Sequence, residues 1–260
     1  MTNHSDKAPA ERVALFVTCL VDLYRPSVGL ATVELLERAG YQIDVPTGQT
    51  CCGQPAWNSG DNRRAGILAR QTMDALAGYD HVVVPSGSCA STLIHGYPQL
   101  FADTPEDLIR AEALAARTWE LTRFLVEVAG LDDLDAGLSG SACYHDACAG
   151  LRELGIKQQP RQLLAQVDGL ELREMADTEA CCGFGGTFCV KYPEISSRLV
   201  SDKARAIEQT GADTVIAGDL GCLMNIAGHL TRQGSAVRAY HIAEVLADRT
   251  DHPAIGEGED

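Results

Sequence analysis

The chain has 260 residues, of which 45% are hydrophobic and 22% charged, and its formal net charge is −15 at pH 7. This composition is typical of a globular protein with a substantial core. The acidic balance argues against nucleic acid or an anionic membrane surface as the main partner. No run of about 18 apolar residues occurs, so we expect no membrane span. The polar start MTNHSDKAPAER lacks the apolar segment of a secretory signal, which predicts a cytoplasmic protein.

The chain contains ten cysteines, an unusual number for a protein expected in a reducing compartment. Disulfides are rare in such compartments because thiols are kept reduced. The cysteines therefore indicate metal binding, an iron–sulfur cluster or redox chemistry.

Four cysteines recur with nearly the same spacing in the two halves of the chain. The first set is Cys19, Cys51, Cys52 and Cys89, and the second is Cys148, Cys181, Cys182 and Cys222. Equivalent cysteines lie 129, 130, 130 and 133 residues apart. This repetition predicts an internal duplication with one four-cysteine site in each repeat.

Strands and helices alternate along the first half. The pattern predicts a strand at 13–17, a helix at 29–40 that ends at a glycine, a strand at 42–45, a helix at 63–78 and a strand at 81–89. In the second half, strands are predicted at 141–145, 170–175 and 213–222, again ahead of the cysteines. This alternation predicts an α/β fold made of two homologous repeats, each a small parallel sheet of three strands flanked by helices.

The boundaries of the repeats follow from a second local match. The segment 104–130 reads as helical, and its end, ELTRFLVE, matches HIAEVLAD at 241–248. We therefore expect a first repeat over 11–130, a second over 131–250 and an acidic tail over 251–260, with GEGED at its end disordered. Because ligands bind at the carboxyl edge of parallel strands, each sheet should bring its four thiols to one place.

Four dispersed thiolates suit iron–sulfur clusters or zinc. The chain lacks the paired CxxC motifs of ordinary zinc sites and the compact cysteine runs of ferredoxins, so we expect a bulky cluster held between loops. Gly53, Gly183, Gly185 and Gly186 follow the cysteine pairs and can bring backbone N–H groups close to sulfur. A tight turn explains any one of these glycines equally well.

The double Cys…Cys-Cys-Gly…Cys pattern resembles the cysteine-rich CCG domain. That domain occurs in the cysteine-rich subunit of heterodisulfide reductase, in the iron–sulfur subunit of glycolate oxidase and in lactate-utilisation protein A. The stretches VGLATVELLERAG, CCGQPAWNSG, YHDACAGLRELGI, CCGFGGTF and GCLMNIAGHL look specifically like the lactate-utilisation protein A family. The resemblance runs from about residue 13 to residue 247.

The resemblance implies an iron–sulfur electron-transfer subunit of a cytoplasmic complex that oxidises L-lactate to pyruvate. Its implied partners are a ferredoxin-like iron–sulfur protein and a third small subunit. The eight cysteines of the two sets are then the ligands, with one [4Fe–4S] cluster in each repeat.

One departure from the related heterodisulfide reductase family bears on cluster type. The cysteine-rich subunit of that enzyme ends each repeat with Cys-x-x-Cys and holds its non-cubane clusters with five cysteines. In this chain Thr92 and Asn225 stand where the last cysteine would be. The missing cysteines weigh against a thiol/disulfide enzyme like heterodisulfide reductase, which stays an alternative together with a zinc-holding structural or docking subunit.

Four further residues lie close to the predicted ligands. His145 is expected to contact the cofactor, by donating a hydrogen bond to sulfur or by relaying a proton. Asp146 is expected either to share that role or to cap the helix that starts near Ala149. Cys143 and Cys189 fall outside the repeated frame, and we expect both to be structural.

Overall fold

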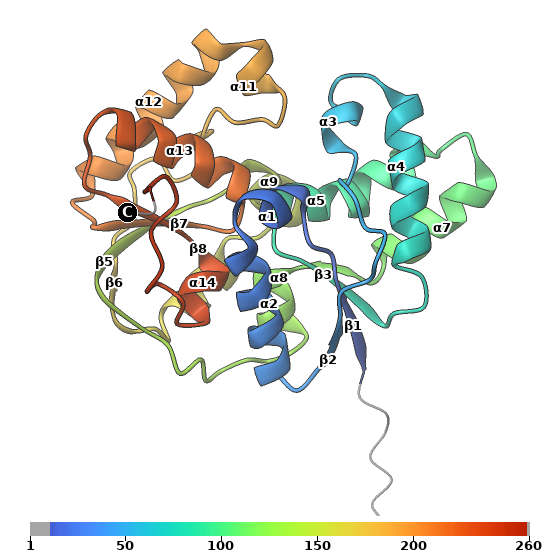
Figure 1. Cartoon of the computed structure of the whole chain (residues 1–260), viewed down its shortest axis with the longest axis horizontal. Coiled ribbons are helices and arrows are strands. Elements are labelled where there is room, and N and C mark those ends of the chain that lie inside the picture. Colours follow the sequence, from blue (N-terminus) through green and yellow to red (C-terminus); the bar gives the residue numbers. More distant parts are fainter. Residues whose placement is uncertain (1–10, 259–260) are drawn as a thin grey trace, which may run out of the picture.

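Two four-stranded parallel sheets, one from each half of the chain, form the frame of the protein (Figure 1). The computed structural model describes residues 11–258. The first sheet has the order β2-β1-β3-β4 and the second the order β6-β5-β7-β8. The strands are β1 (Arg12–Leu15), β2 (Gln42–Asp44), β3 (His81–Val84), β4 (Thr118–Glu120), β5 (Gly137–His145), β6 (Asp168–Leu172), β7 (Thr214–Ala217) and β8 (Arg238–His241). The predicted fold class, with two parallel-sheet repeats, is confirmed.

Helices connect the strands and cover both faces of each sheet. In the first repeat these are α1 (Cys19–Tyr24), α2 (Pro26–Arg38), α3 (Gln54–Trp57), α4 (Asn62–Ala75), α5 (Gly87–Ser91), the π-helical turn η1 (Thr92–Gly96), α6 (Tyr97–Leu100), α7 (Pro105–Ala115) and α8 (Leu121–Glu127). In the second repeat they are α9 (Cys148–Leu154), α10 (Gln158–Leu164), α11 (Phe188–Lys191), α12 (Pro193–Gln209), α13 (Leu220–Arg232) and α14 (Ile242–Leu246).

Each sheet has one strand more than the sequence analysis predicted. The segment 104–130, expected to be helical, is broken by β4, in which Thr118 pairs with Val82 of β3. Its counterpart β8 pairs with β7 in the second sheet. A strand as short as β4 carries too few residues for a period-two pattern, so the prediction of a continuous helical segment was wrong.

Successive side chains of a strand point to opposite faces of the sheet, so each strand contributes to two cores when both faces are covered. Val13 and Val83 point into a core shared by the two repeats, whereas Ala14 and Val82 point into a separate core under the outer helices of the first repeat. The second repeat has its own outer core against α12 and α13.

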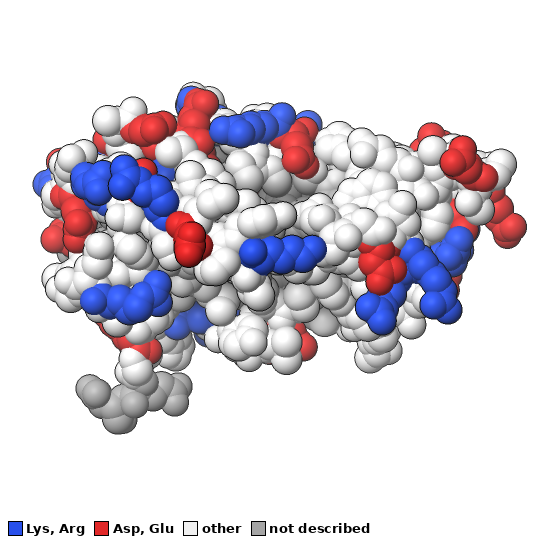
Figure 2. Space-filling view, turned by 90° about the horizontal axis from the view of Figure 1, so that it is seen from above, with Lys and Arg blue, Asp and Glu red and all other residues white. Residues whose placement is uncertain are grey.

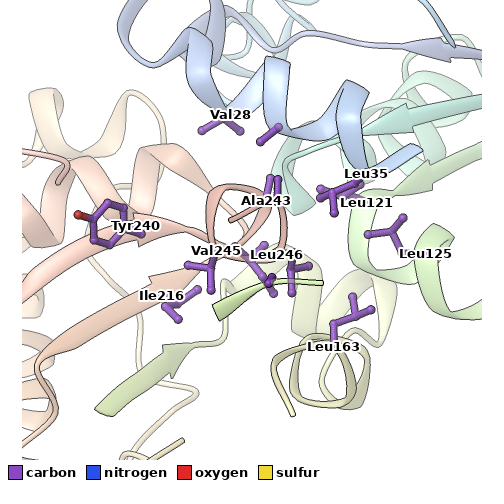
Figure 3. Close-up of a cluster of buried hydrophobic side chains, with 14 of the residues drawn as sticks. Val28, Leu35, Leu121, Leu125, Leu163, Ile216, Tyr240, Ala243, Val245 and Leu246 are labelled. Atoms are coloured by element: carbon purple, nitrogen blue, oxygen red, sulfur yellow. The ribbon is translucent and has the colours of Figure 1, made fainter. Parts of the chain in front are cut away.

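The shared core lies between the two sheets and is built from helices of both repeats (Figure 3). The helix after the first cysteine in each repeat packs on the last helix of the other, so α2 contacts α14 and α10 contacts α8. Val28 and Leu35 of α2 and Val245 and Leu246 of α14 are completely buried there. Each such side chain contributes about 1.5–3 kcal/mol by leaving water, so the repeats stabilise one another.

A buried ion pair adds to this contact between the repeats. Glu244 of α14 is completely buried and accepts hydrogen bonds from Arg25 Nε at 2.7 Å and from Ser27 Oγ at 2.6 Å, both at the start of α2. A buried carboxylate needs such partners because burial removes its hydration. The pair therefore fixes which faces of the two repeats meet.

The C-terminal segment is not free of the fold up to Gly258. Ile255 donates its backbone N–H to the Ala239 carbonyl at 2.9 Å, and Ala254 is buried. The expectation of disorder at GEGED is therefore wrong for residues 256–258, where Glu257 accepts from the Ala254 N–H at 2.7 Å. Residues 259–260, like residues 1–10, lie outside the described residues.

Over residues 11–258, no helix combines the length and the apolar character that crossing a bilayer requires. The face shown in Figure 2 carries acidic and basic side chains interspersed around a broad uncharged area. Such a mixture gives no single-sign field to steer a polyanion toward this face.

Candidate metal centres

The four cysteines of the first repeat come from three loops at the carboxyl ends of the strands. Cys19 is the first residue of α1, after β1, and Cys89 lies in the first turn of α5, after β3. Cys51 and Cys52 lie between β2 and α3. Parallel strands end at one edge of their sheet, which is why these three loops meet.

The four sulfurs of this first set form a continuous chain of contacts. Cys52 donates to Cys89 Sγ at 3.4 Å, and Cys51 interacts with Cys19 and Cys52. The bond from Cys19, followed by that from Cys52, lowers the pKa of Cys51 to about 3. Thiolate is the form that binds metals, so this arrangement favours a ligand-competent sulfur at Cys51.

The second repeat reproduces the arrangement. Cys148 is the first residue of α9 and Cys222 lies in the first turn of α13. Cys148 and Cys182 donate to Cys181, which lowers the pKa of Cys181 to about 2, and Cys182 is also hydrogen-bonded to Cys222. All eight predicted ligands are thus brought together in two sets of four, although their role as ligands stays a prediction.

The first glycine after each pair approaches sulfur through its backbone. Gly183 N–H donates to Cys181 Sγ at 3.3 Å, and Gly53 N–H makes the same bond to Cys51. Both also have positive φ, +86° at Gly53 and +80° at Gly183, so the turn and the contact with sulfur occur together. Gly185 and Gly186 have positive φ as well and line the pocket beside the second set, but within residues 11–258 neither donates its N–H to a cysteine sulfur.

His145 ends β5 and points into the second set. One ring nitrogen and the sulfurs of Cys182 and Cys222 all lie within 4.8 Å of one another. The side chain is 1% exposed, and neither ring nitrogen has a hydrogen-bond partner. Burial, followed by the nearby charge of Lys203, lowers the pKa of His145 to about 3, so the ring is neutral at neutral pH.

A pocket adjoins each set, and the two pockets differ. The pocket beside the first set has a volume of about 230 Å³ and is lined by apolar groups such as Leu20, Phe184 and Val190. The pocket beside the second set measures about 560 Å³ and is lined by polar side chains including Asn58 and Gln99. No lysine or arginine of the described chain lines either pocket.

The two sites are neighbours, and one side chain borders both. Asp219 lines both pockets and is buried. Its Oδ2 accepts hydrogen bonds from Ser86 Oγ at 3.0 Å and from Ser88 N–H at 3.1 Å, both in the opposite repeat. The sequence analysis missed this residue. Asp219 stands three residues before Cys222, and Ser86 stands three residues before Cys89. This equivalent spacing was the signal in the sequence that could have pointed to Asp219.

Neither residue at the missing fifth-cysteine positions is free. Asn225 Nδ2 donates to the Cys182 carbonyl at 2.8 Å, and Thr92 Oγ1 donates to the Ser88 carbonyl at 2.9 Å. In the first repeat it is Tyr97 OH that donates to the equivalent Cys52 carbonyl, at 2.9 Å. These side chains therefore stabilise the cysteine-bearing segments by donating hydrogen bonds to their backbone carbonyls.

Three residues near the sites have structural contacts. Asp146 does not cap α9, whose N-cap is Ala147 with no side-chain hydrogen bond; it forms a two-pronged pair with Arg161, at 2.9 Å for each bond. That buried pair outcompetes a cap because it compensates the burial of the carboxylate. Cys143 is fully buried in the outer core, and burial raises its pKa to about 11. Cys189 donates to the Gly186 carbonyl.

The donor sets fit a thiolate-held metal centre. Each lines up four sulfurs as a chain of neighbours, and the second adds a buried imidazole whose nitrogens have no hydrogen-bond partner within the described residues. Thiolate and imidazole suit zinc and iron–sulfur clusters, whereas carboxylates and carbonyls, which calcium and magnesium prefer, are few here. The arrangement is that of a duplicated cysteine-rich protein whose sulfur groups have the chemistry of metal ligands.

Comparison with known proteins agrees with this class. The sequence model of the Cysteine-rich domain family (CCG) matches residues 13–94 and 142–227, one match in each repeat. A crystal structure of a hypothetical protein from Helicobacter pylori superposes with a TM-score of 0.67 at 10% identity, covering 94% of this chain and 50% of that one. At this identity the likeness concerns the fold alone.

Proteins of similar sequence identify the family to which the chain belongs. Lactate utilization protein A of Geobacillus kaustophilus is 50% identical over 92% of this chain and 99% of its own length. The proteins of that name from Geobacillus thermodenitrificans and Bacillus subtilis are 51% and 47% identical, again over 92% of this chain. The chain belongs to the lactate utilization protein A family.

Proposed function

We propose that the chain is an iron–sulfur electron-transfer subunit of a cytoplasmic complex that oxidises L-lactate to pyruvate, with one [4Fe–4S] cluster in each repeat. The observation that carries the proposal is the gathering of four cysteine sulfurs twice, in a chain whose relatives are named for lactate utilisation. The proposed partners are a ferredoxin-like iron–sulfur protein and a third subunit.

The eight cysteines would hold the clusters, which supply reversible one-electron transfer when bound. The chain's own contribution is position and environment. Gly53 and Gly183 direct N–H groups at the sulfur of the first cysteine in each pair, and hydrogen bonds to sulfur tune the reduction potential of a cluster. Asp219 joins the loop of Cys89 to the helix of Cys222, so the two sites are held next to each other.

The pockets support electron transfer over direct binding of lactate by this subunit. Proteins usually recognise a carboxylate with arginine or lysine. Among residues 11–258, the ionisable side chains that line the two pockets, cysteines apart, are His95, Glu153 and Asp219. Two of these are acidic and would repel a carboxylate. Lactate is therefore expected to react in another subunit, with this chain passing the electrons on.

Iron and acid-labile sulfide measured on protein purified without oxygen test the proposal. We expect a brown protein with iron and sulfide for two clusters, whose visible absorption bleaches on reduction. Colourless protein that takes up no iron or sulfide after anaerobic reconstitution would contradict it.

A second candidate is a structural or docking subunit that holds zinc. The observation in its favour is the 3.4 Å contact between the sulfurs of Cys52 and Cys89. A tetrahedral zinc with Zn–S bonds of about 2.3 Å places its sulfurs about 3.8 Å apart, and a cluster with one thiolate on each iron needs a wider spacing. Elemental analysis of the same anaerobic sample separates the two candidates, since it reports zinc in place of iron.

A further inference from the structure

The imidazole of His145 has no partner of its own within the described fold. Its ring is 1% exposed and both nitrogens lack hydrogen bonds. Native proteins pair the large majority of their buried polar atoms, and an exception points to a missing ligand, ion or water. The sulfurs of Cys182 and Cys222 lie within 4.8 Å of one ring nitrogen.

The neighbouring cation does not supply the missing partner. Lys203 is buried next to this site, but its Nζ donates to the Asp177 carbonyl at 2.7 Å and to the Thr178 carbonyl at 3.1 Å. Both acceptors are backbone carbonyls, so neither bond involves the ring.

The first repeat has an apolar side chain at the equivalent position. Phe16 stands three residues before Cys19, just as His145 stands three residues before Cys148. Phe16 is completely buried and belongs to the apolar core of the first repeat. The duplication keeps four sulfurs in both halves, but the residue three positions before the first cysteine is apolar in the first repeat and of a metal-ligating type in the second.

We propose that the second site is a mixed nitrogen–sulfur centre, in which His145 donates a ring nitrogen to the same metal centre as Cys182 and Cys222, whereas the first site is held by thiolates alone. This inference rests on the proposed function only in requiring a metal centre at the cysteines, and it holds for iron–sulfur clusters and for zinc. If the imidazole takes the place of one thiolate on the iron, it raises the reduction potential of an iron–sulfur centre. The second centre is then the easier one to reduce, so electrons collect beside the larger pocket.

Pulsed EPR on the anaerobically reduced full chain tests the inference. Wild-type protein should show the hyperfine coupling of a directly bound imidazole nitrogen, and labelling histidine with ¹⁵N should change that signal without altering any residue. The variant His145→Phe, which installs the first repeat's side chain, should lose the coupling and lower the potential of one centre only. Phe16→Leu is the matched control and should keep both the coupling and that potential.

The outcomes separate the inference from the function on which it rests. Iron and sulfide bound without any imidazole coupling, or a coupling that survives in His145→Phe, would overturn the inference and leave the proposed function intact. If zinc is bound, X-ray absorption should show nitrogen at about 2.0–2.1 Å in wild type and lose it in His145→Phe, and sulfur ligation alone at both sites would overturn the inference. Protein that binds no metal at all would overturn both.

Discussion

The first and second cysteine sites share a frame but differ in what surrounds it. In both, one cysteine begins a helix, a pair precedes a left-handed glycine, and the last cysteine lies in the first turn of a helix. Around the first site lie Phe16 and a pocket of about 230 Å³ with apolar walls. Around the second lie His145 and a pocket of about 560 Å³ whose wall includes polar side chains such as Asn58 and Gln99.

This difference separates the parts of the duplicated site that both repeats keep from the parts that have diverged. The sulfurs and the N–H groups directed at them are the same in both repeats. In both repeats a side chain donates a hydrogen bond to the carbonyl of the second cysteine of the pair. The donor is Tyr97 in the first repeat and Asn225 in the second, so the bond is kept although the residue is not. The environment beyond that bond has diverged, so the two centres are expected to have different potentials.

The largest expected effect concerns the ligands themselves. Cys52→Ser should remove the metal of the first site only, and Cys182→Ser that of the second only, because Cys52 interacts with Cys51 and Cys89 and Cys182 with Cys181 and Cys222, all members of their own sets. Each variant should retain about half of the wild-type metal and the double variant none, as measured by elemental analysis of anaerobic protein. Cys143→Ala, outside both sets, should keep all of it. Complete loss from either single variant would show that the two sites do not load independently.

The glycines after the pairs should differ in their tolerance of a side chain. A Cβ on Gly183 would lie 2.6 Å from the Ser196 carbonyl oxygen, whereas a Cβ on Gly53 meets nothing closer than 3.5 Å. Both positions have positive φ, which costs an alanine about 1–2 kcal/mol. Gly53→Ala should therefore destabilise by about 1 kcal/mol and Gly183→Ala by about 3 kcal/mol, once the overpacking is added.

Urea unfolding measures both changes, and the chain offers a control. Gly48 also has positive φ, at +88°, and a Cβ there meets nothing within 4 Å. Gly48→Ala therefore isolates the backbone cost, and its destabilisation should match that of Gly53→Ala. Equal effects at Gly53 and Gly183 would mean that the loop of the second pair moves to make room.

The supports of the cysteine pairs should have similar energetic weight despite their different chemistry. Tyr97→Phe and Asn225→Ala each leave the carbonyl of a buried cysteine without its donor. An unsatisfied buried acceptor costs about 1–3 kcal/mol, so both variants should unfold at lower urea concentration by that margin. Tyr192→Phe, at an exposed position, should change the free energy of unfolding by less than about 0.5 kcal/mol. A neutral Asn225→Ala would mean that water replaces the amide in the more open second site.

Much of this frame could be predicted from the sequence because its signals are local or repeated. The spacing of the cysteines showed the duplication, and the rule that parallel strands end at one edge predicted that each set would gather. The strand over 13–17 and the helix over 29–40 correspond to β1 and α2, with shifts of a few residues at their ends. The three-residue strand β4 was missed because it forms through its pairing with β3, which is distant in sequence, and three residues are too few to show a strand pattern of their own.

The surroundings of the sites could not be predicted for the same reason. Asp219 acts on Ser86 and Ser88 of the other repeat, and Asp146 finds Arg161 instead of the helix end beside it. Both contacts join elements that meet only in the folded chain. The sequence showed only that Asn225 stands where a fifth cysteine was expected. Its hydrogen bond to the Cys182 carbonyl became visible only in the structure.

The smallest expected effect comes from the residues that cap the last helix of each repeat. Glu120 caps α8 and His241 caps α14, and both are buried, but burial moves their pKa values in opposite directions: it raises the pKa of Glu120 and lowers the pKa of His241. Below about pH 6.5 the unfolded chain protonates His241 while the fold keeps it neutral, so this histidine lowers stability as the pH falls. Glu120 acts in the opposite sense, because the fold keeps its proton to higher pH than the unfolded chain does.

Two substitutions separate these contributions. His241→Asn keeps a side chain that caps helices well and removes the titration, so the fall in unfolding free energy between about pH 6.5 and 5 should become shallower by up to about 1.4 kcal/mol per pH unit. Glu120→Gln removes the opposing contribution and should make that fall steeper. Urea unfolding at several pH values measures both slopes. Slopes identical to wild type in His241→Asn would mean that His241 titrates alike in the folded and unfolded chain, and the asymmetry between the two caps would then have no consequence for stability.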